Sequence, residues 1–276
     1  MELARLDSFG PNRERVAVAN AHESAADGEV LAYLGDFHSS QVMETAPILG
    51  AAGVLQVAPV ATHAGLRGDT LVRLMPHDGV GARAIAGWLA GVGVRRVLVV
   101  HDEDSDYGAP VAAMCVDAAA ERRLAVRSRP VWNHDERPAD DLDDAEAVVY
   151  VGVAGPDAPR MWHELCTANP ALWLIGSEGV AQAHFAQALE PAETQRTRLF
   201  VPARAPLAFY GYEATCLITD AIVAGAGDRS ATVRAARATH DRNSVIGRYS
   251  LDGDGHTTSL AYGRMVIVDG TLVWDT

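Results

Sequence analysis

Short apolar runs alternate along this chain with longer segments whose apolar residues recur every three or four positions. Runs such as residues 30–35, 95–100 and 172–176 are bounded by turn residues and predict buried strands. Residues 78–92 place apolar side chains at positions i, i+3, i+4 and i+7, which is one face of a helix. A regular alternation of strand and helix predicts parallel sheets that helices cover on both faces.

The same pattern predicts elements along the whole chain. The expected helices are residues 13–26, 39–52, 78–92, 106–122, 156–168, 180–189, 208–224 and 230–239. The expected strands are residues 1–6, 30–35, 54–58, 95–100, 124–131, 147–152, 172–176 and 199–202, then antiparallel strands around Tyr249, 262–268 and 271–274. These strands are too many for one modest sheet, so we expect two α/β domains.

Composition limits the possible functions. The 276 residues carry a formal net charge of −13, which repels phosphate backbones and argues against nucleic-acid binding. All 23 basic residues are Arg, so a Schiff-base lysine and a P-loop lysine are both excluded. No apolar run is expected to be long enough to span a bilayer.

The sequence offers no set of catalytic residues. Cys115, Cys166 and Cys216 are widely spaced and form no CxxC pair, and we expect Cys115 and Cys216 to be small buried hydrophobes. Neither a nucleophile elbow nor a glycine-rich dinucleotide loop after the first strand is present. We therefore predict a protein that is not an enzyme, with no catalytic residue and no cofactor.

Two acidic stretches could suggest a metal. Residues 101–108 hold several carboxylates but lack the spacing of a calcium loop, and we favour Asp106 as a helix cap and Tyr107 as an aromatic wall. Residues 252–255 are Asp-Gly-Asp-Gly, which favours a tight turn between strands. The prediction is no metal site.

Polar side chains follow three of the predicted strands, where ligands bind in open α/β sheets. Ser39 starts a helix, Thr62 lies in a turn whose N–H groups could join Ser39 in holding a carboxylate, and Glu178 stands at a turn apex where it could hold a cation. Each has a plain alternative that stays open: a serine helix cap, an ordinary turn, and a glutamate at a helix N-terminus.

In chain order, the segments GDFHSS, APVATHAGL, VHDEDSDYG and IGSEGVA resemble the type I periplasmic solute-binding proteins of ABC transporters, specifically the branched-chain amino-acid (Leu/Ile/Val) group. The later segments YGYEA, SVIGRYSLDGDG and YGRMVIVDG resemble the same family. The resemblance implies two doubly wound α/β domains that close on a ligand in the cleft between them. It implies ligand-binding roles for Ser39 and Thr62 (carboxylate), Val60 (backbone), Tyr107 (cleft wall), Glu178 (α-ammonium) and Asp78 (near the cleft).

The resemblance also implies domain limits. The first domain is expected to hold residues 1–101 with 203–246, and the second residues 102–202 with 247–276. Because residues 1–6 align with the second strand of the family, we expect the first strand-helix unit of the fold to be missing. Where the family often has an aromatic residue after residues 148–152, this chain has Val153-Ala154-Gly155, which favours an altered specificity.

The function that this resemblance implies is binding of a small polar metabolite, most readily an amino acid, for an ABC transporter. Its partners would be the ligand and a transporter permease, and a homodimer stays open. The alternative is a ligand-sensing or regulatory domain of the same fold. The family implies an extracytoplasmic parent protein. The N-terminal residues show no signal peptide, so a cytoplasmic location stays open.

Overall fold

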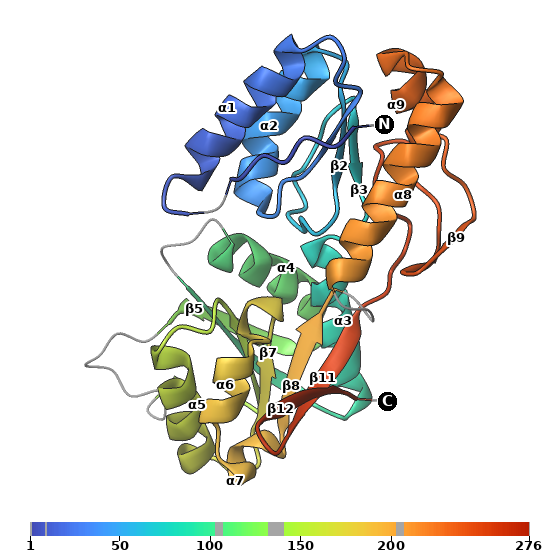
Figure 1. The fold of residues 1–276 in the computed structure, drawn as a ribbon. Coiled ribbons are helices and arrows are strands. Elements are labelled where there is room, and N and C mark those ends of the chain that lie inside the picture. The colour runs from blue at the N-terminus through green and yellow to red at the C-terminus, as the bar shows by residue number, and fades with distance from the viewer. Residues whose placement is uncertain (1, 9, 103–106, 132–140, 203–206, 276) are drawn as a thin grey trace. The chain divides into compact units, whose positions relative to one another are not determined.

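The computed structural model describes residues 2–8, 10–102, 107–131, 141–202 and 207–275. The chain divides into two compact units, each made from two stretches of sequence. Unit 1 is Met1–His77 with Ala203–Ala261, and unit 2 is Asp78–Pro202 with Tyr262–Thr276. Figure 1 shows both units as mixtures of helices and strands.

Unit 1 has a parallel sheet of three strands in the order β1-β2-β3 and a separate antiparallel pair, β9 and β10. Its strands are β1 (Ala32–Leu34), β2 (Leu55–Ala58), β3 (Leu71–Arg73), β9 (Arg242–Ser244) and β10 (Gly247–Tyr249). Its helices are α1 (Arg13–Ala26), α2 (Ser39–Ala51), α8 (Leu207–Gly225) and α9 (Arg229–Arg237).

Helices cover both faces of the three-stranded sheet of unit 1 (Figure 1). On one face, Val42 and Ala46 of α2 pack with Ala58 and Leu71 of the strands. Helix α8 covers the other face. Its buried residues pack against Leu55, Val57 and Val72, which point to the opposite side of the strands from Ala58 and Leu71. Burial of both faces explains why these short strands are mostly apolar, with Gln56 and Arg73 as buried polar exceptions.

Unit 2 has a seven-stranded sheet in the order β12-β11-β8-β7-β6-β4-β5. The pairs from β5 to β8 are parallel, and β11 and β12 close the sheet in antiparallel fashion. Its strands are β4 (Arg96–His101), β5 (Ala125–Pro130), β6 (Ala147–Val151), β7 (Trp173–Gly176), β8 (Thr197–Val201), β11 (Gly263–Val268) and β12 (Thr271–Trp274). Its helices are α3 (Asp78–Gly91), α4 (Gly108–Glu121), α5 (Asp157–Ala168), the 3₁₀ turn η2 (Glu178–Val180), α6 (Ala183–Ala188) and α7 (Pro191–Thr194).

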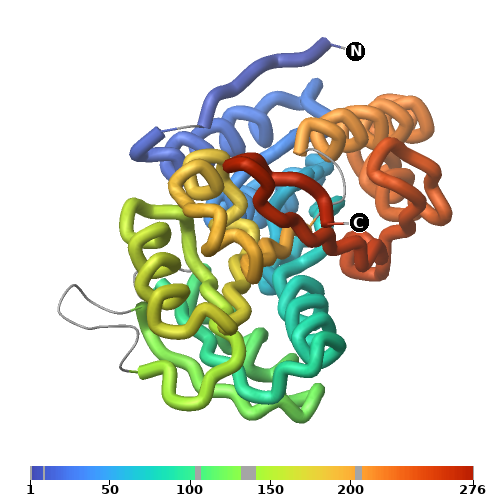
Figure 2. Tube along the Cα trace, turned by 90° about the horizontal axis from the view of Figure 1, so that it is seen from below, coloured from blue at the N-terminus to red at the C-terminus, as the bar shows by residue number. Residues whose placement is uncertain are grey.

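The two faces of this larger sheet carry different helices. Ile85 of α3 and Val111 of α4 pack on the face that presents Val149 of the central strand β6. The opposite face presents Val148 and packs against Trp162 of α5, together with residues of α6. The C-terminal strand β12 lies beside α6, as Figure 2 shows. Every residue of β6 is buried, so the sheet core lies around this strand.

The unit limits differ from those expected from the sequence. Strand β4 pairs with β5 and β6, so residues 78–101 fold with unit 2 rather than with the first domain. Residues 247–261 remain with unit 1, where β10 pairs with β9. Strand pairing decides this division, and the sequence pattern of a strand does not reveal its neighbour.

Two element predictions are wrong, and the short elements β3 and α7 were not expected. Residues 2–8 form no strand, and Leu3 is 80% exposed, because no strand of unit 1 pairs with them. Strand β3 was not expected from the pattern, since it is only three residues long. The helix expected at 180–189 is instead η2 followed by α6, which begins at Ala183. The remaining predicted elements are present within a few residues of their expected ends.

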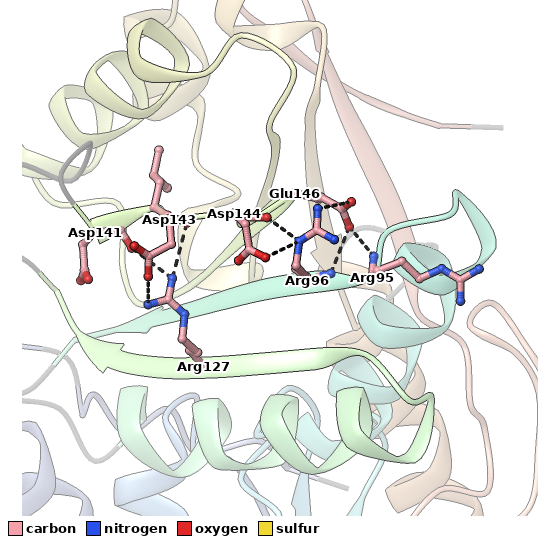
Figure 3. Close-up of polar contacts among 8 residues, drawn as sticks. Arg95, Arg96, Arg127, Asp141, Asp143, Asp144 and Glu146 are labelled. Carbon is pink, nitrogen blue, oxygen red and sulfur yellow. Dashed lines mark hydrogen bonds and ion pairs between the residues drawn. The ribbon is translucent and has the colours of Figure 1, made fainter.

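The Asp-rich stretch before β6 is held by arginines of the neighbouring strands (Figure 3). Glu146 accepts hydrogen bonds from the backbone N–H groups of Arg95 (2.6 Å) and Arg96 (3.0 Å) and pairs with the Arg96 guanidinium at 2.8 Å. Arg127 pairs with Asp143 at 2.8 Å. Exposed pairs of this kind contribute at most about 1 kcal/mol each, so this stretch is a solvated loop edge.

Helix α8 corrects one expectation about membranes. Its 19 residues are long and apolar enough to cross a membrane, by length and composition only. Core helices of soluble proteins pass the same test. Here Ala214, Leu217 and Ala221 are buried against the sheet, so we interpret α8 as a core helix of unit 1.

Candidate functional site

Three neighbouring strands of unit 2 end in closely packed loops. Asp102, after β4, accepts hydrogen bonds from the Tyr150 hydroxyl (2.6 Å) and the Val153 N–H (3.0 Å) beyond β6. A Cβ on Gly179, after β7, would lie 2.2 Å from the carbonyl oxygen of Gly152. The β6 and β7 loops therefore meet backbone to backbone, which fixes the position of the residue before Gly179.

That residue is Glu178, the first residue of η2. The Tyr107 hydroxyl donates a hydrogen bond of 2.7 Å to its Oε1. Tyr107 immediately precedes α4, so a side chain from the β4 connection is joined to one from the β7 connection. Two residues that lie 71 positions apart are thus brought together at the carboxyl edge of the sheet.

A small cavity of unit 2 lies beside this pair. Asp78, at the first position of α3, lines it together with Glu178 and is only 3% exposed. Tyr262, just before β11, lines it as well and lies against α3 at Gly81, where a Cβ would approach the tyrosine ring to 2.5 Å. The remaining lining residues are Ala82, Ile85, Val111, Cys115, Val151, Ser177 and Phe200.

The surroundings change the acidity of the site. Burial, with the negative charge of Asp78 adding to it, raises the pKa of Glu178 to about 7, although the hydrogen bond from Tyr107 acts in the opposite direction. Burial and the Glu178 charge raise the pKa of Tyr107 well above its ordinary value, so the phenol remains a donor. Carboxylates in such a site are stabilised when a cation enters.

Cys115 lines the same cavity from α4 and is 4% exposed. Burial raises the pKa of its thiol to about 12. Only a thiolate is strongly nucleophilic, so this cysteine acts as a small apolar residue, as predicted.

In unit 1, Ser39 lies in the first turn of α2 and contacts the β2–β3 connection. Its Oγ accepts hydrogen bonds from the backbone N–H groups of Thr62 and His63, both at 3.2 Å. The expected serine cap is therefore wrong: α2 begins after His38, whose N–H is bound by the Gln41 side chain at 3.2 Å. The two N–H groups expected to face a ligand donate to Ser39 instead. The Ser39 hydroxyl can therefore donate its own proton to a different acceptor.

The structure places the six sequence-predicted site residues as follows. Asp78, Tyr107 and Glu178 are together in unit 2 around the cavity and its edge. Ser39 and Thr62 are in contact in unit 1, and Val60 lies in the same connection as Thr62, packed against the core. The sequence pattern did not reveal Tyr262 and Gly81, although Tyr262 belongs to the YGRMVIVDG segment that carries part of the resemblance.

The other candidate stretches have structural roles. Asp252 Oδ1 accepts the N–H groups of Asp254 and His256, both at 2.9 Å, which closes the tight turn that was predicted. Asp102 supports the β6 loop, and the proposed cap Asp106 lies outside the described residues. Within the described ranges, no group of His, Cys, Asp and Glu side chains could hold a metal ion.

Residues 8–160, more than half of the chain, match the family described as receptor family ligand binding region. The chain belongs to this family. No curated protein matches this chain.

Solved structures show that the fold of this ligand-binding region is that of type I periplasmic binding proteins. A leucine-binding protein of Thermotoga maritima is 18% identical with a TM-score of 0.81, covering 100% of this chain and 87% of its own. An ABC transporter substrate-binding protein of Desulfitobacterium hafniense in complex with Leu is 18% identical with a TM-score of 0.80, covering 94% and 84%. A solute-binding protein of R. palustris in complex with benzoate is 15% identical with a TM-score of 0.72, covering 95% and 81%. These proteins bind small molecules.

Proposed function

We propose that this chain binds an amino acid without transforming it, with the ligand ammonium at Glu178 and the ligand carboxylate at Ser39 and Thr62. The observation that carries the proposal is the carboxylate of Glu178, oriented by Tyr107 beside a cavity that a second carboxylate also lines. Carboxylates gathered in a water-poor site favour a cationic group. Tyr107 adds a cavity-edge aromatic ring, and Asp78 adds negative charge.

The hydroxyl of Ser39 supports the carboxylate half of the proposal. Because its oxygen already accepts two N–H groups, its own proton is available for an acceptor such as a carboxylate. Thr62, whose N–H binds Ser39, provides a second hydroxyl in the same connection, and the backbone of Val60 completes this half.

The benzoate complex among the similar folds offers a different ligand class, an aromatic acid without an ammonium group. The Glu178 carboxylate argues against that class for this chain, since an acid that lacks a cation would bring a second negative charge beside it. Benzoate is therefore the control ligand, and L-leucine is the first ligand to test.

Replacing Glu178 with Gln tests the proposal. Gln keeps the shape and can still accept the hydrogen bond from Tyr107, but it removes the charge that holds the ammonium. The affinity for L-leucine should fall by about 2–5 kcal/mol, since the ligand charge would remain buried and unpaired. Isothermal titration calorimetry of the protein and the variant measures this loss.

Glu164 on α5 offers a matched control, because its carboxylate pairs with Arg160 on a helix surface at 3.2 Å and lines no part of the cavity. Glu164→Gln should bind L-leucine as the unaltered protein does. Equal affinity in Glu178→Gln, or binding of benzoate in preference to every amino acid, would show that the assignment is wrong.

We further propose that the ligand is a branched-chain amino acid delivered to an ABC transporter permease, and that the parent protein is extracytoplasmic. Support comes from the similar folds that hold Leu and Ile. The competing proposal, a sensory or regulatory domain, predicts the same ligand contacts but no permease. Uptake of L-leucine into membrane vesicles that contain a permease separates the two proposals. Binding of L-leucine together with uptake supports the transporter role, and binding without uptake supports the sensory role.

A further inference from the structure

Helix α8 buries one side in unit 1 and presents a row of mostly apolar side chains on the other. Leu217, Ile218 and Ala221 belong to the side that packs in the core of unit 1. On the opposite side, Tyr212 is 61% exposed and Val223 is 75% exposed. The row, called the outer stripe below, consists of Phe209, Tyr212, Cys216, Thr219 and Val223.

The members of the outer stripe follow one another at intervals of three, four, three and four residues. This spacing forms a seam for a second helix, because it keeps every member on one side of α8. A helix at the surface of a single globular unit normally has polar residues on its outer side. The stripe therefore has the pattern of a surface that receives another helix.

The hydroxyl groups on this side of α8 already have partners within the helix. Thr219 donates to the Thr215 carbonyl oxygen at 2.8 Å, and Thr215 donates to the Gly211 carbonyl oxygen at 2.9 Å. A partner can therefore cover both threonines without leaving a hydroxyl donor unpaired.

The distribution of charge favours contact between two copies at this stripe. The charged residues of α8 are Glu213 and Asp220, and Arg242 binds them at 2.5 and 2.8 Å. The stripe itself carries no charge, whereas the whole chain has a formal net charge of −13. Two copies therefore repel each other less across this stripe than across their acidic surfaces.

The outer stripe is also complementary to itself in size. Its aromatic members, Phe209 and Tyr212, lie toward the N-terminus of α8, and the smaller Thr219 and Val223 lie toward the C-terminus. When two copies pair antiparallel about a two-fold axis, the aromatic end of each stripe meets the smaller end of the other. Antiparallel pairing also places opposite helix dipole ends beside each other, which is favourable.

The available area is that of a weak but specific dimer. Aromatic side chains of this kind bury about 150–250 Å² each. With Val223 and the flanking residues, the stripe offers roughly 500 Å² per copy, so a pair would bury roughly 1,000 Å², which is the lower limit for a specific interface.

A lipid surface is the other partner that an apolar helix side could have. Helices that lie on membranes carry Lys and Arg along their polar side. Helix α8 contains neither, and both of its charged residues are acidic. A second copy of the chain is therefore favoured over a membrane.

We propose that two copies of this chain form a dimer through the outer stripe, with their α8 helices antiparallel and with the middle of the stripe, Cys216, near the two-fold axis. The contact belongs to unit 1 and involves none of the proposed ligand-binding residues. The dimer and the proposed function can therefore fail independently.

Sedimentation equilibrium between about 1 μM and 1 mM protein measures the association. We expect a monomer–dimer equilibrium in the micromolar range, and Tyr212→Arg or Val223→Arg should weaken it by about tenfold or more. Arginine lowers the net negative charge, so greater repulsion between copies does not account for such a loss. Both positions are exposed in the monomer, so both variants should fold.

Val16→Arg is the matched control, because Val16 is also an exposed valine on a helix of unit 1 but belongs to α1. This variant should associate as the unaltered protein does. A monomer at every concentration, or equal weakening by Val16→Arg and Val223→Arg, overturns the inference. Flotation of the protein with phosphatidylcholine vesicles that is lost in Val223→Arg also overturns it, because lipid would then cover the stripe.

Cross-linking tests the antiparallel arrangement. Phe209→Cys and Val223→Cys are each made in a protein that also carries Cys166→Ser and Cys216→Ser, and the remaining Cys115 is buried. A short bifunctional maleimide should join one variant to the other in a mixture, and should join neither variant to itself. Cross-links within each variant alone, without cross-links between the two, overturn the antiparallel dimer.

Discussion

Ser39 illustrates how a single hydroxyl can be prepared for binding before any ligand arrives. Its oxygen accepts N–H groups of Thr62 and His63 at 3.2 Å, which orients the group and leaves its proton to be donated. Ser40, the next residue, donates instead to the carboxylate of Glu14 at 3.0 Å. Adjacent serines in one helix turn therefore have different hydrogen-bonding roles.

Replacing Ser39 with Ala should weaken binding of L-leucine by roughly 1.5–3 kcal/mol, the usual range for a hydrogen bond to a charged group. Ser40→Ala should change the affinity several times less. Calorimetric titration of both variants makes the comparison, and equal losses would mean that Ser39 has no special role.

Glu213 is a second residue whose partners define its role. It is 3% exposed in α8 and accepts hydrogen bonds from Arg242 (2.5 Å) and the Tyr249 hydroxyl (2.8 Å), which join α8 to β9 and β10. Glu213→Ala should lower the free energy of unfolding by about 3–5 kcal/mol, because it leaves a largely buried arginine with one partner fewer.

Asp220→Ala is the control for this prediction. Asp220 also pairs with Arg242, at 2.8 Å, but its side chain is 65% exposed, and exposed pairs contribute at most about 1 kcal/mol. Urea unfolding measures both variants. A loss in Asp220→Ala as large as that in Glu213→Ala would contradict the argument from burial.

At the scale of elements, the decisive contact is the one between the loops that follow β6 and β7. Gly179 allows the two backbones to meet, since a Cβ there would lie 2.2 Å from the carbonyl oxygen of Gly152. The Ala154 N–H also donates to the Gly179 carbonyl at 3.0 Å. The position of Glu178 thus depends on the packing of two loops rather than on its own turn alone.

Gly179→Ala should lower the free energy of unfolding by about 1–3 kcal/mol, the usual cost of overpacking, and should weaken L-leucine binding as well. Gly155→Ala is the matched control in the same loop region, because nothing lies within 4 Å of a Cβ built there. Denaturant unfolding and calorimetry on both variants check this pair, and a Gly179→Ala protein that matches the original in both would refute it.

At the scale of the whole molecule, stability should depend on pH through a buried histidine of unit 1. His256 is 6% exposed, and its Nδ1 lies 3.0 Å from an Arg73 guanidinium nitrogen. Burial, with the charge of Arg73 adding to it, lowers the pKa of His256 to about 4, against an ordinary value of 6.5. Between these values the unfolded chain binds a proton that the folded chain does not, so lowering the pH favours unfolding.

The protein should therefore lose roughly 2–3 kcal/mol of unfolding free energy relative to His256→Gln as the pH falls from about 7 to 4. The comparison with the variant is needed because Glu178, whose pKa is raised to about 7, has the opposite effect and stabilises the fold as the pH falls toward 4.5. Urea unfolding at several pH values measures the difference. Parallel pH profiles for the two proteins would rule out this role of His256.

The sequence by itself determined the fold class and most of the elements. Buried strands such as β6 are apolar at every position, and helices such as α3 repeat at the helical period, because burial against the sheet selects for both patterns. The ordered motifs also determined the family and directed attention to Ser39, Thr62 and Glu178. These features are local in the chain, so a local pattern can reveal them.

Only the tertiary structure decided which elements are neighbours and what the polar groups contact. Residues 2–8 alternate like a strand but have no partner strand, and β4 belongs to unit 2 because it pairs with β5 and β6. The same holds for Tyr262, which reaches α3 from a segment more than 170 positions away because Gly81 lacks a side chain. Strand pairing and close packing join residues distant in sequence, and their free energy depends on both partners at once, so no single segment encodes them.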